Sequence, residues 1–220
     1  MSYSFDAFRD AIGDDWYADD ARLGALLDRY GAGDRAERAG IARFGAEAAG
    51  TLARLAEISA RPENAPRLRA YDAWHQRVDA IELPASTEEA LAIVAGRERL
   101  GALYGDPFAF YAKTYLAHQN GEAGVACSLA CTDGLTRLLA ALGDRDEHRA
   151  ALAAMRGSSE RLVVHAAQFV TEIQGGSDVG ANAVEAVPDG DAFRLHGPKW
   201  FCSNVNADLF LVSARPRGAP

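Results

Sequence analysis

The stretch FVTEIQGGSDVGANAV (residues 169–184) joins a strand-like run to a glycine-rich turn. The run before the turn, residues 162–171, is rich in β-forming residues. Gly175 and Gly176 have no Cβ, so successive N–H groups can face one concavity, an arrangement that binds anions and phosphates in particular. Ser177 adds a hydroxyl, and Asp178 can brace the loop by accepting N–H bonds. The same residues are also typical of a plain tight turn with an Asx interaction.

The chain before residue 160 predicts helices. Apolar residues recur at helical spacing in DDARLGALLDRYGA (residues 19–32), where Asp19 or Asp20 is a natural cap. The pattern continues in RAERAGIARFGAEAAGTLARLAEISA (residues 35–60) and ends at two prolines. Ser86 or Thr87, followed by Glu89, predicts a capping box for a further helix. These segments indicate an all-α helical domain over residues 1–160.

Strand signals dominate after residue 160. The segment AVEAVPDGDAFRLHGPKWFCSN (residues 183–204) alternates apolar and polar residues around an Asp-Gly turn, which predicts a hairpin and a strand at KWFCSN. DLFLVSARP (residues 208–216) predicts another strand. We therefore expect an α+β fold in which residues 161–220 begin a β domain. A sheet of so few strands has unpaired edges, so we expect the chain to be part of a larger protein or to have a partner.

Composition limits the classes of partner. The formal net charge of −8 argues against a nucleic-acid coat or an anionic membrane surface as partner of this half. No stretch approaches the ~20 continuous apolar residues of a membrane span. Three cysteines cannot complete a disulfide framework, which agrees with reduced thiols in the cytoplasm. We expect a cytoplasmic protein.

Two motifs carry a resemblance to a known family. TEIQGGSD (residues 171–178), followed by GPKWFCSN (residues 197–204), resembles the acyl-CoA dehydrogenase pattern Thr-Glu-x-x-x-Gly-Ser-Asp and then Gly-x-Lys-x-Trp-Ile-Thr-Asn. GEAGVACSLACTDG (residues 121–134) is similar to the family's Gly-x-x-Cys-x-x-x-x-Thr helix. The Gln-Gly-Gly-Ser-Asp and Lys-Trp-Phe forms look most like its DNA-alkylation-response (AidB-like) branch. The resemblance implies a helical domain, then an antiparallel β-barrel domain, then a helical bundle that this chain lacks.

The resemblance also implies the residues that bind the cofactor FAD. The strand before the turn would lie along the flavin's pyrimidine edge; its residues are Gln168, Phe169, Val170 and Thr171. Gly176 and Ser177 would meet the pyrophosphate, and Ser177 would also border the acyl-CoA thioester. Phe201 takes the position of the family's tryptophan, which lies against the flavin ring. Ser203 takes the position of the family's threonine, whose hydroxyl reaches flavin N5. Cys202 takes the position of the β-branched residue next to that threonine.

The implied activity is α,β-dehydrogenation of an acyl thioester with hydride transfer to flavin N5. The family's catalytic base is a carboxylate in the bundle, so this chain contains no catalytic residue and is expected to be inactive alone. Alternatives are an oxidase or monooxygenase acting on a non-CoA substrate, and a DNA-associated protective flavoprotein with marginal dehydrogenase activity. A homo-oligomer (dimer or tetramer) or a complementing C-terminal chain is the expected partner. A non-catalytic interaction module is a third reading.

Other signals are weaker. Cys127 and Cys131, four residues apart, predict buried thiols, since a metal site needs more ligands. An aromatic group at helical spacing indicates either plain core or the lining of an acyl or flavin pocket; its members are Phe108, Phe110, Tyr111 and Tyr115. A small basic group predicts a solvated face or a subunit contact; its members are Arg67, Arg69 and Arg77.

Overall fold

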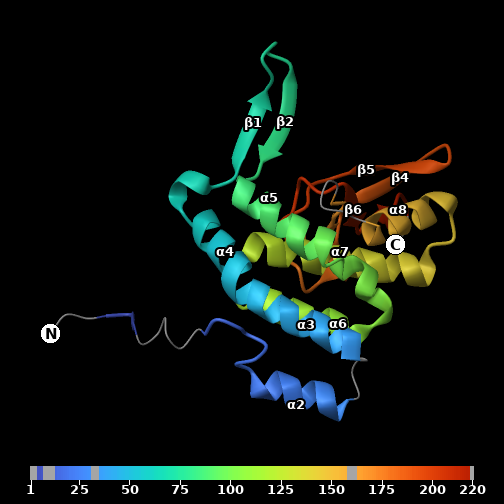
Figure 1. The fold of residues 1–220 in the computed structure, drawn as a ribbon. Helices are drawn as coiled ribbons and strands as arrows, with labels where there is room; N and C mark the ends of the chain where they lie inside the picture. Colours follow the sequence, from blue (N-terminus) through green and yellow to red (C-terminus); the bar gives the residue numbers. More distant parts are fainter. Residues whose placement is uncertain (1–3, 7–12, 31–34, 158–162, 219–220) are drawn as a thin grey trace. The chain divides into compact units, whose positions relative to one another are not determined.

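The computed structural model describes residues 4–6, 13–30, 35–157 and 163–218 (Figure 1). The chain divides into two compact units. Unit 1 comprises Met1–Ala126 and Ala153–Val163, and unit 2 comprises Cys127–Leu152 and Val164–Pro220. The change from helices to strands falls near the predicted residue 160, but the assignment of residues 1–160 and 161–220 to two domains stays a prediction.

Unit 1 is built mainly from helices. They are α2 (Ala21–Arg29), α3 (Arg35–Glu47), α4 (Ala53–Ser59), α5 (Ala85–Leu91), α6 (Pro107–His118) and the start of α7 (Ala123–Leu142). π-Helical turns continue α3 at Ala48–Leu52 and α5 at Ala92–Arg97; short 3₁₀ turns occupy Pro62–Asn64 and Leu100–Gly105. The fully buried core side chains come from several of these segments: Ile41, Phe44, Leu52, Leu55, Val94, Leu100 and Leu116.

The Asp20 side chain caps α2, and the cap predicted at Ser86 or Thr87 is wrong. The Asp20 carboxylate accepts the Arg22 and Leu23 N–H groups, both at 3.0 Å, which confirms one of the two predicted caps of α2. The capping box at Ser86 or Thr87 does not form, because α5 already begins at Ala85 after Pro84. Both hydroxyls are buried inside the helix and hydrogen-bond with Ser59 Oγ of α4, at 2.8 and 3.0 Å.

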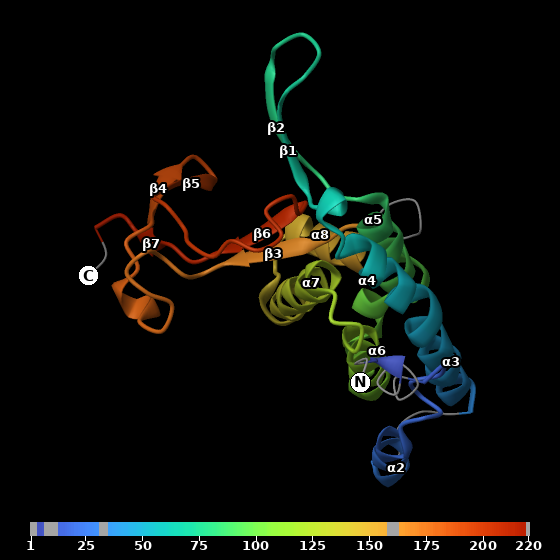
Figure 2. The ribbon, with the colours of Figure 1, turned by 90° about the vertical axis from the view of Figure 1, so that its left-hand side faces the viewer.

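A β-hairpin interrupts the helices of unit 1. Strands β1 (Arg67–Tyr71) and β2 (Arg77–Glu82) pair antiparallel. Figures 1 and 2 both show this hairpin standing out from the helices. The prediction that the first part of the chain is purely helical is therefore wrong for residues 67–82.

Unit 2 combines the rest of α7 and most of α8 (Asp146–Arg156) with the remaining strands. β4 (Glu185–Asp189) and β5 (Ala192–His196) form the predicted hairpin, with Gly190 at φ 61° in its turn. β3 (Ala166–Phe169) pairs with β6 (Leu209–Val212), and β4 pairs with β7 (Arg215–Pro216), both in parallel. A 3₁₀ turn occupies Val179–Ala181.

Residues 161–220 were predicted to form only the start of an antiparallel β-barrel domain, and the barrel itself stays a prediction. The described residues contain one antiparallel and two parallel pairs in this unit, and these strands do not close into a barrel. The β4–β5 hairpin lies between β3 and β6 in the sequence, and a connection of that length allows two strands to run in the same direction. The mixed helix and sheet content of the α+β prediction is confirmed.

Helix α7 has the length and hydropathy that crossing a bilayer would need, and it is the one such helix among the described residues. Asp133 and Arg137 interrupt the apolar residues of this helix, and these two side chains pair across one helical turn at 2.8 Å. Thr132 on the same helix is buried, and its Oγ1 accepts the N–H of Ala166 in β3 at 2.9 Å. We therefore interpret this part of α7 as a core helix of unit 2.

Candidate functional site

A buried carboxylate organises the glycine-rich turn of unit 2. Glu172 accepts the N–H groups of Ala183 at 2.6 Å and Val184 at 3.1 Å, and the Lys199 ammonium at 2.8 Å. The Ala183 N–H bond, followed by Lys199, lowers the pKa of Glu172 from 4.5 to about 2. The carboxylate is therefore ionised at neutral pH and draws three parts of the chain to one point.

Lys199 donates hydrogen bonds to residues at and beside the glycine-rich turn. Besides Glu172, its Nζ donates to the Val170 carbonyl at 3.2 Å and to Ser213 Oγ at 3.1 Å. Both charged side chains of the Glu172–Lys199 pair are almost fully buried. Removing one partner would leave a buried charge without compensation, which is costly. The pair therefore fixes the segment around Lys199 against the end of the strand that leads into the turn.

Asn182 completes the bracing of the turn. Its Nδ2 donates to the Val170 carbonyl at 2.7 Å and to Ser213 Oγ at 3.3 Å, and its Oδ1 accepts Gln174 Nε2 at 2.9 Å. The sequence predicted this bracing role for Asp178, but the Asp178 side chain caps no N–H of the 3₁₀ turn that follows it. The correction has a simple cause: the buried amide of Asn182 reaches both ends of the loop.

The two glycines have different roles in the turn. Gly175 has φ 148° and open space where a Cβ would stand, and its N–H donates to the Glu172 carbonyl at 3.0 Å. A Cβ on Gly176 would lie 2.9 Å from Thr171 Oγ1, so the missing side chain is what allows the threonine hydroxyl to sit there. Ser177, next to it, is exposed. The turn thus presents Thr171, Gly176 and Ser177 close together.

The segment at residues 199–204 is not the predicted strand. Phe201 has φ 54° and Asn204 has φ 56°, and such left-handed residues do not fit an extended strand. The Trp200 N–H instead donates to the Thr171 carbonyl at 2.9 Å. The Phe201 ring is 83% exposed and lies edge-on to Trp200, with the ring centroids 6.0 Å apart. An apolar ring is therefore held in solvent beside the end of β3.

Polar contacts anchor β3 at its other end. The carbonyl of Ala166 accepts Asn204 Nδ2 at 3.0 Å, while Thr132 takes the N–H of the same residue. Gln168 Nε2 donates to the Cys131 carbonyl at 3.0 Å, so this side chain is engaged on α7. Burial, followed by the nearby Cys127, raises the pKa of the Cys131 thiol. All three cysteines are free and half-buried.

The structure brings the two predicted segments together. Residues 168–171 lie next to residues 200–203 through the Trp200–Thr171 hydrogen bond. Phe169 packs against Phe210 of β6, with ring centroids 5.1 Å apart; Val170 and Cys202 are half-buried, and Ser203 is exposed. The contact of these residues with a flavin stays a prediction. Among the described residues, no cluster of three or more His, Cys, Asp and Glu side chains could hold a metal ion.

Sequence reasoning missed the residues that hold the site together. These are Thr132, Glu172, Asn182, Lys199, Asn204 and Ser213. Glu172 and Lys199 both stood inside the quoted motifs, and a charged residue within apolar alternation is a signal for a buried pair. Asn182 and Ser213 carried no such signal, because both are uncharged and both hydrogen-bond to the carbonyl of Val170, which is distant in the sequence.

Comparison with known proteins agrees with this arrangement. The family model described as "Adaptive response protein AidB N-terminal domain" matches residues 8–158. Acyl-CoA dehydrogenase family member 11 of Caenorhabditis elegans is 34% identical over 162 residues, which cover 68% of this chain and 26% of that protein. Putative acyl-CoA dehydrogenase AidB of Escherichia coli K12 is 32% identical over 225 residues, which cover 92% of this chain and 39% of that protein.

Two solved structures have the same fold over nearly the whole chain. The crystal structure of Caenorhabditis elegans ACDH-11 in complex with C11-CoA has a TM-score of 0.78 and 30% identity, covering 91% of this chain and 36% of that one. The Bd2924 apo-form has a TM-score of 0.80 and 27% identity, covering 93% of this chain and 43% of that one. This chain thus spans less than half the length of each of these relatives.

These findings place the chain in the acyl-CoA dehydrogenase family. Within that family it belongs to the AidB branch, of which it corresponds to the N-terminal portion, as the resemblance of its motifs predicted.

Proposed function

We propose that the site of unit 2 binds FAD and that the whole protein acts on an acyl thioester. The observation that carries this proposal is the junction of residues 168–171 with residues 200–203, made by the Trp200–Thr171 hydrogen bond and the Glu172–Lys199 pair. These are the two segments that, by the resemblance of their motifs, would line the flavin. A strand end, a threonine hydroxyl and an exposed aromatic ring lie side by side there.

The residues present fit a flavin dinucleotide. The exposed Phe201 ring offers an apolar surface that stacking on a flat ring system would cover. The Gly176–Ser177 corner offers backbone N–H groups and a hydroxyl, and the open space at Gly175 leaves room for a diphosphate to approach. In this proposal Gln168, Phe169, Val170 and Thr171 line the pyrimidine edge of the ring, and Cys202 and Ser203 follow Phe201 beside it.

FAD bound there would accept a hydride from the substrate. The protein would bind and orient the cofactor and the substrate and would set the electrostatic environment of the site. Within this chain, Lys199 and Glu172 hold Thr171 and Trp200 in register, and Ser177 borders the thioester. The proposed substrate is an acyl-CoA, supported by the acyl-CoA dehydrogenase names of both curated relatives and by the C11-CoA complex of ACDH-11. No carboxylate of this chain is assigned as the base.

A matched pair of glycine variants tests flavin binding in the full-length protein. Gly176→Ala sets a Cβ 2.9 Å from Thr171 Oγ1 and must displace that hydroxyl, whereas the Cβ of Gly180→Ala makes only ordinary contact with the Asp178 carboxylate at 3.5 Å. We expect Gly176→Ala to weaken FAD binding at least tenfold, measured by flavin fluorescence titration, and Gly180→Ala to leave it unchanged.

Two outcomes would contradict the proposal. One is a native protein that purifies without flavin and takes up none on reconstitution. The other is equal FAD affinity in the two glycine variants, which would show that the turn is only a turn.

A DNA-associated protective role is the second candidate, favoured by the match to the adaptive-response AidB family model. The net charge of −8 does not favour a DNA surface on this part of the protein. Turnover of acyl-CoA by the full-length protein, compared with its retention of duplex DNA at physiological salt, distinguishes the two. DNA binding without turnover would favour the second candidate.

A further inference from the structure

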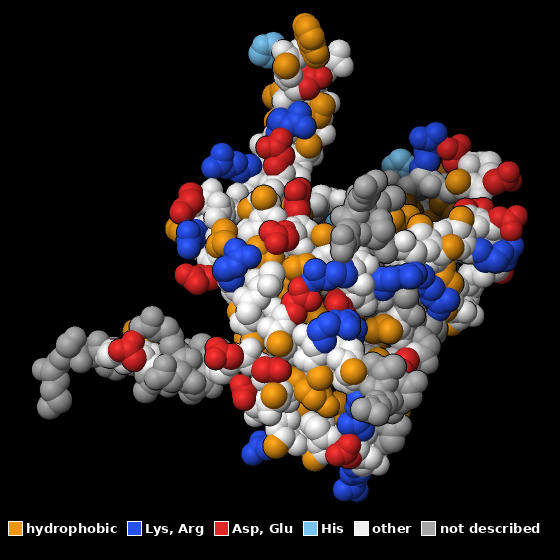
Figure 3. Space-filling model, viewed as in Figure 1, with side chains coloured by type: hydrophobic (Ala, Val, Ile, Leu, Met, Phe, Trp, Pro, Cys, Tyr) orange, Lys and Arg blue, Asp and Glu red, His pale blue; other side chains and the backbone are white. Residues whose placement is uncertain are grey.

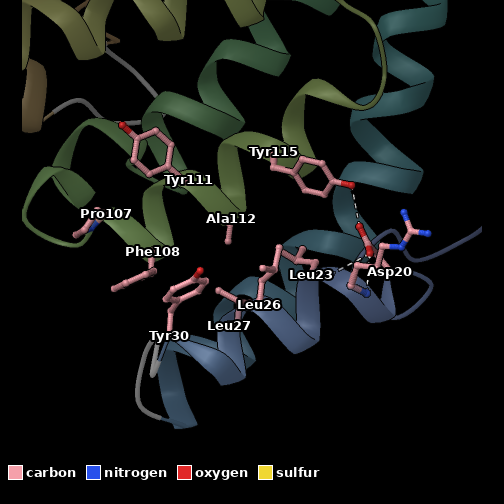
Figure 4. A pocket seen from close by; sticks show the side chains of 11 residues that line it. Asp20, Leu23, Leu26, Leu27, Tyr30, Pro107, Phe108, Tyr111, Ala112 and Tyr115 are labelled. Atoms are coloured by element: carbon pink, nitrogen blue, oxygen red, sulfur yellow. Dashed lines mark hydrogen bonds between the residues drawn. The ribbon is translucent and has the colours of Figure 1, made fainter.

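Open apolar surfaces lie in unit 1. Of the aromatic group that the sequence predicted as core or pocket lining, Phe110 is buried, and Phe108, Tyr111 and Tyr115 line a groove of about 640 Å³ between α2 and α6 (Figure 4). Tyr115 closes one end of the groove by donating a hydrogen bond to the Asp20 carboxylate at 2.7 Å. Figure 3 shows further hydrophobic side chains on the projecting β1–β2 hairpin. Between α7 and β3 of unit 2, by contrast, the contacts are closed and polar.

A glycine lies in the interior of α7, at the point where β3 contacts this helix. Glycine makes a helix interior less stable than alanine does, so Gly134 needs a local reason. A Cβ at this position would lie 2.0 Å from Gln168 Nε2 and 3.0 Å from Gln168 Cδ. The missing side chain of Gly134 therefore makes room for the amide of Gln168, a residue of β3.

The Gln168 amide uses this room to bind the helix backbone. Its Nε2 donates to the Cys131 carbonyl at 3.0 Å, about one helical turn before Gly134. A backbone carbonyl has two lone pairs, and inside a helix the N–H four residues later takes only one of them. The second is left for Gln168, and Gly134 keeps the approach to it open.

Two buried hydroxyls of α7 hold the beginning of the same strand. Thr132 Oγ1 accepts the Ala166 N–H at 2.9 Å, and Ser128 Oγ lies 3.4 Å from Asn204 Nδ2, which in turn donates to the Ala166 carbonyl at 3.0 Å. These bonds fix only the first residue of β3. Gln168 lies two residues further along and extends the attachment toward the end of the strand, where the candidate flavin site begins.

The contact with α7 also determines what the Gln168 side chain can reach. Successive side chains of a strand point to opposite faces, so Phe169, which packs against Phe210 of β6, points away from Gln168. An amide seated over Gly134 could meet a flavin only by leaving the helix and giving up its bond to the Cys131 carbonyl. The structure thus separates the Gln168 amide from the residues that follow it.

We propose that Gln168 is a positioning residue of the flavin site: its amide, seated over Gly134 on α7, fixes the strand that leads to Thr171 and does not contact the cofactor. The inference rests on the proposed flavin site and refines it. Phe169, Val170 and Thr171 remain the residues that would line the pyrimidine edge of the ring, and α7 holds the strand that presents them.

A double-mutant cycle in the full-length protein tests this role, with FAD affinity measured by flavin fluorescence titration. The Cβ of Gly134→Ala meets the Gln168 amide, so either the amide leaves the helix or the strand shifts. We expect this change to weaken FAD binding about tenfold when Gln168 is present, and less than about twofold when it is combined with Gln168→Ala, whose shorter side chain avoids the clash. Gln168→Ala alone should weaken binding about fivefold, because the strand loses its attachment.

Gly40→Ala is the matched control, because it adds the same helix-favouring Cβ to α3 in open space. We expect it to leave FAD affinity unchanged. Native affinity in Gly134→Ala would overturn the proposal, since an amide that left the helix to bind the flavin would not meet the new Cβ. The same loss of affinity in Gly134→Ala with and without Gln168→Ala would also overturn it.

Gln168→Met provides a second measurement without adding a clash, because methionine has a similar length but no donor. We expect FAD binding about threefold weaker, cooperative urea unfolding as in the native protein, and unchanged absorption maxima of the bound flavin. Shifted maxima would show that the amide touches the ring and would overturn the positioning role. A native protein that binds no FAD would contradict the proposed function as well. Native FAD binding with equal affinity in Gln168→Met and Gly134→Ala would overturn the positioning role alone.

Discussion

Two buried lysine–glutamate pairs, one in each unit, hold different kinds of structure. In unit 1, Lys113 of α6 contacts Glu98 at 2.6 Å, where the π-helical turn after α5 ends. In unit 2, Lys199 contacts Glu172 at 2.8 Å. The first pair joins helices that apolar packing already holds, while the second joins segments that have no regular structure.

The surroundings of the two pairs differ accordingly. Glu98 has Arg43 as a second cation at 3.5 Å, and Lys113 stands 5.7 Å from the centroid of the Phe44 ring, so side chains surround this pair. Glu172 takes two backbone N–H groups, and Lys199 gives a hydrogen bond to a backbone carbonyl. We infer that the unit 1 pair affects stability, whereas the unit 2 pair fixes the backbone of the candidate flavin site.

The largest expected effect is on the unit 1 pair. Lys113→Met leaves the Glu98 carboxylate buried with only the exposed Arg43 nearby. We expect the free energy of unfolding to fall by about 3 kcal/mol, the lower end of the range for a broken buried pair. Urea unfolding followed by circular dichroism measures this loss. FAD affinity of the folded protein should stay within twofold of native, and a larger loss of affinity would break the distinction between the pairs.

The corresponding substitution in unit 2, Lys199→Met, should affect FAD binding instead. Lys199→Met removes the three hydrogen bonds that tie Val170, Glu172 and Ser213 together. We expect FAD affinity to fall at least tenfold even where the protein remains folded, measured by flavin fluorescence titration next to Lys113→Met. Native affinity in Lys199→Met would show that the site keeps its shape without the pair.

The same contrast explains which parts of the structure the sequence could predict. The cap at Asp20, the helical core around Phe44 and the Asp-Gly hairpin follow from local patterns, because neighbouring residues determine them. The burial of Ser86 and Thr87 inside a helix could not be predicted from local patterns, because their hydrogen-bond partner Ser59 is far away in the sequence. For the candidate site, the motifs located both segments. They could not locate Asn182 or the left-handed Phe201, because tertiary contacts fix these residues.

Acid should weaken the unit 2 site through Glu172. Its pKa in the folded chain is about 2, below its ordinary value of 4.5, so its stabilising effect is complete above pH 4.5 and is lost as the pH falls to about 2. Glu172→Gln should therefore remove part of the pH dependence of urea unfolding in that window. Glu185→Gln, which breaks an exposed pair with Arg217 instead, is the control and should leave it unchanged. Parallel pH profiles of native protein and Glu172→Gln would contradict the assignment.

The smallest expected effects compare two buried hydroxyls. Ser86→Ala removes one hydrogen bond to Ser59, which keeps Thr87 as a partner at 3.0 Å, so we expect a loss of about 1 kcal/mol in unfolding and no change in FAD affinity. Ser213 contacts Lys199, Asn182 and the Val170 carbonyl. Because Glu172 and Val170 still bind Lys199 in Ser213→Ala, we expect FAD affinity to fall only about two- to threefold, on the order of the ~0.5 kcal/mol of a weak hydrogen bond. Thermal unfolding and flavin titration of both variants measure these effects. If Ser86→Ala lowered FAD affinity as much as Ser213→Ala, Ser213 could no longer be said to position the flavin site while Ser86 only stabilises the packing of helices.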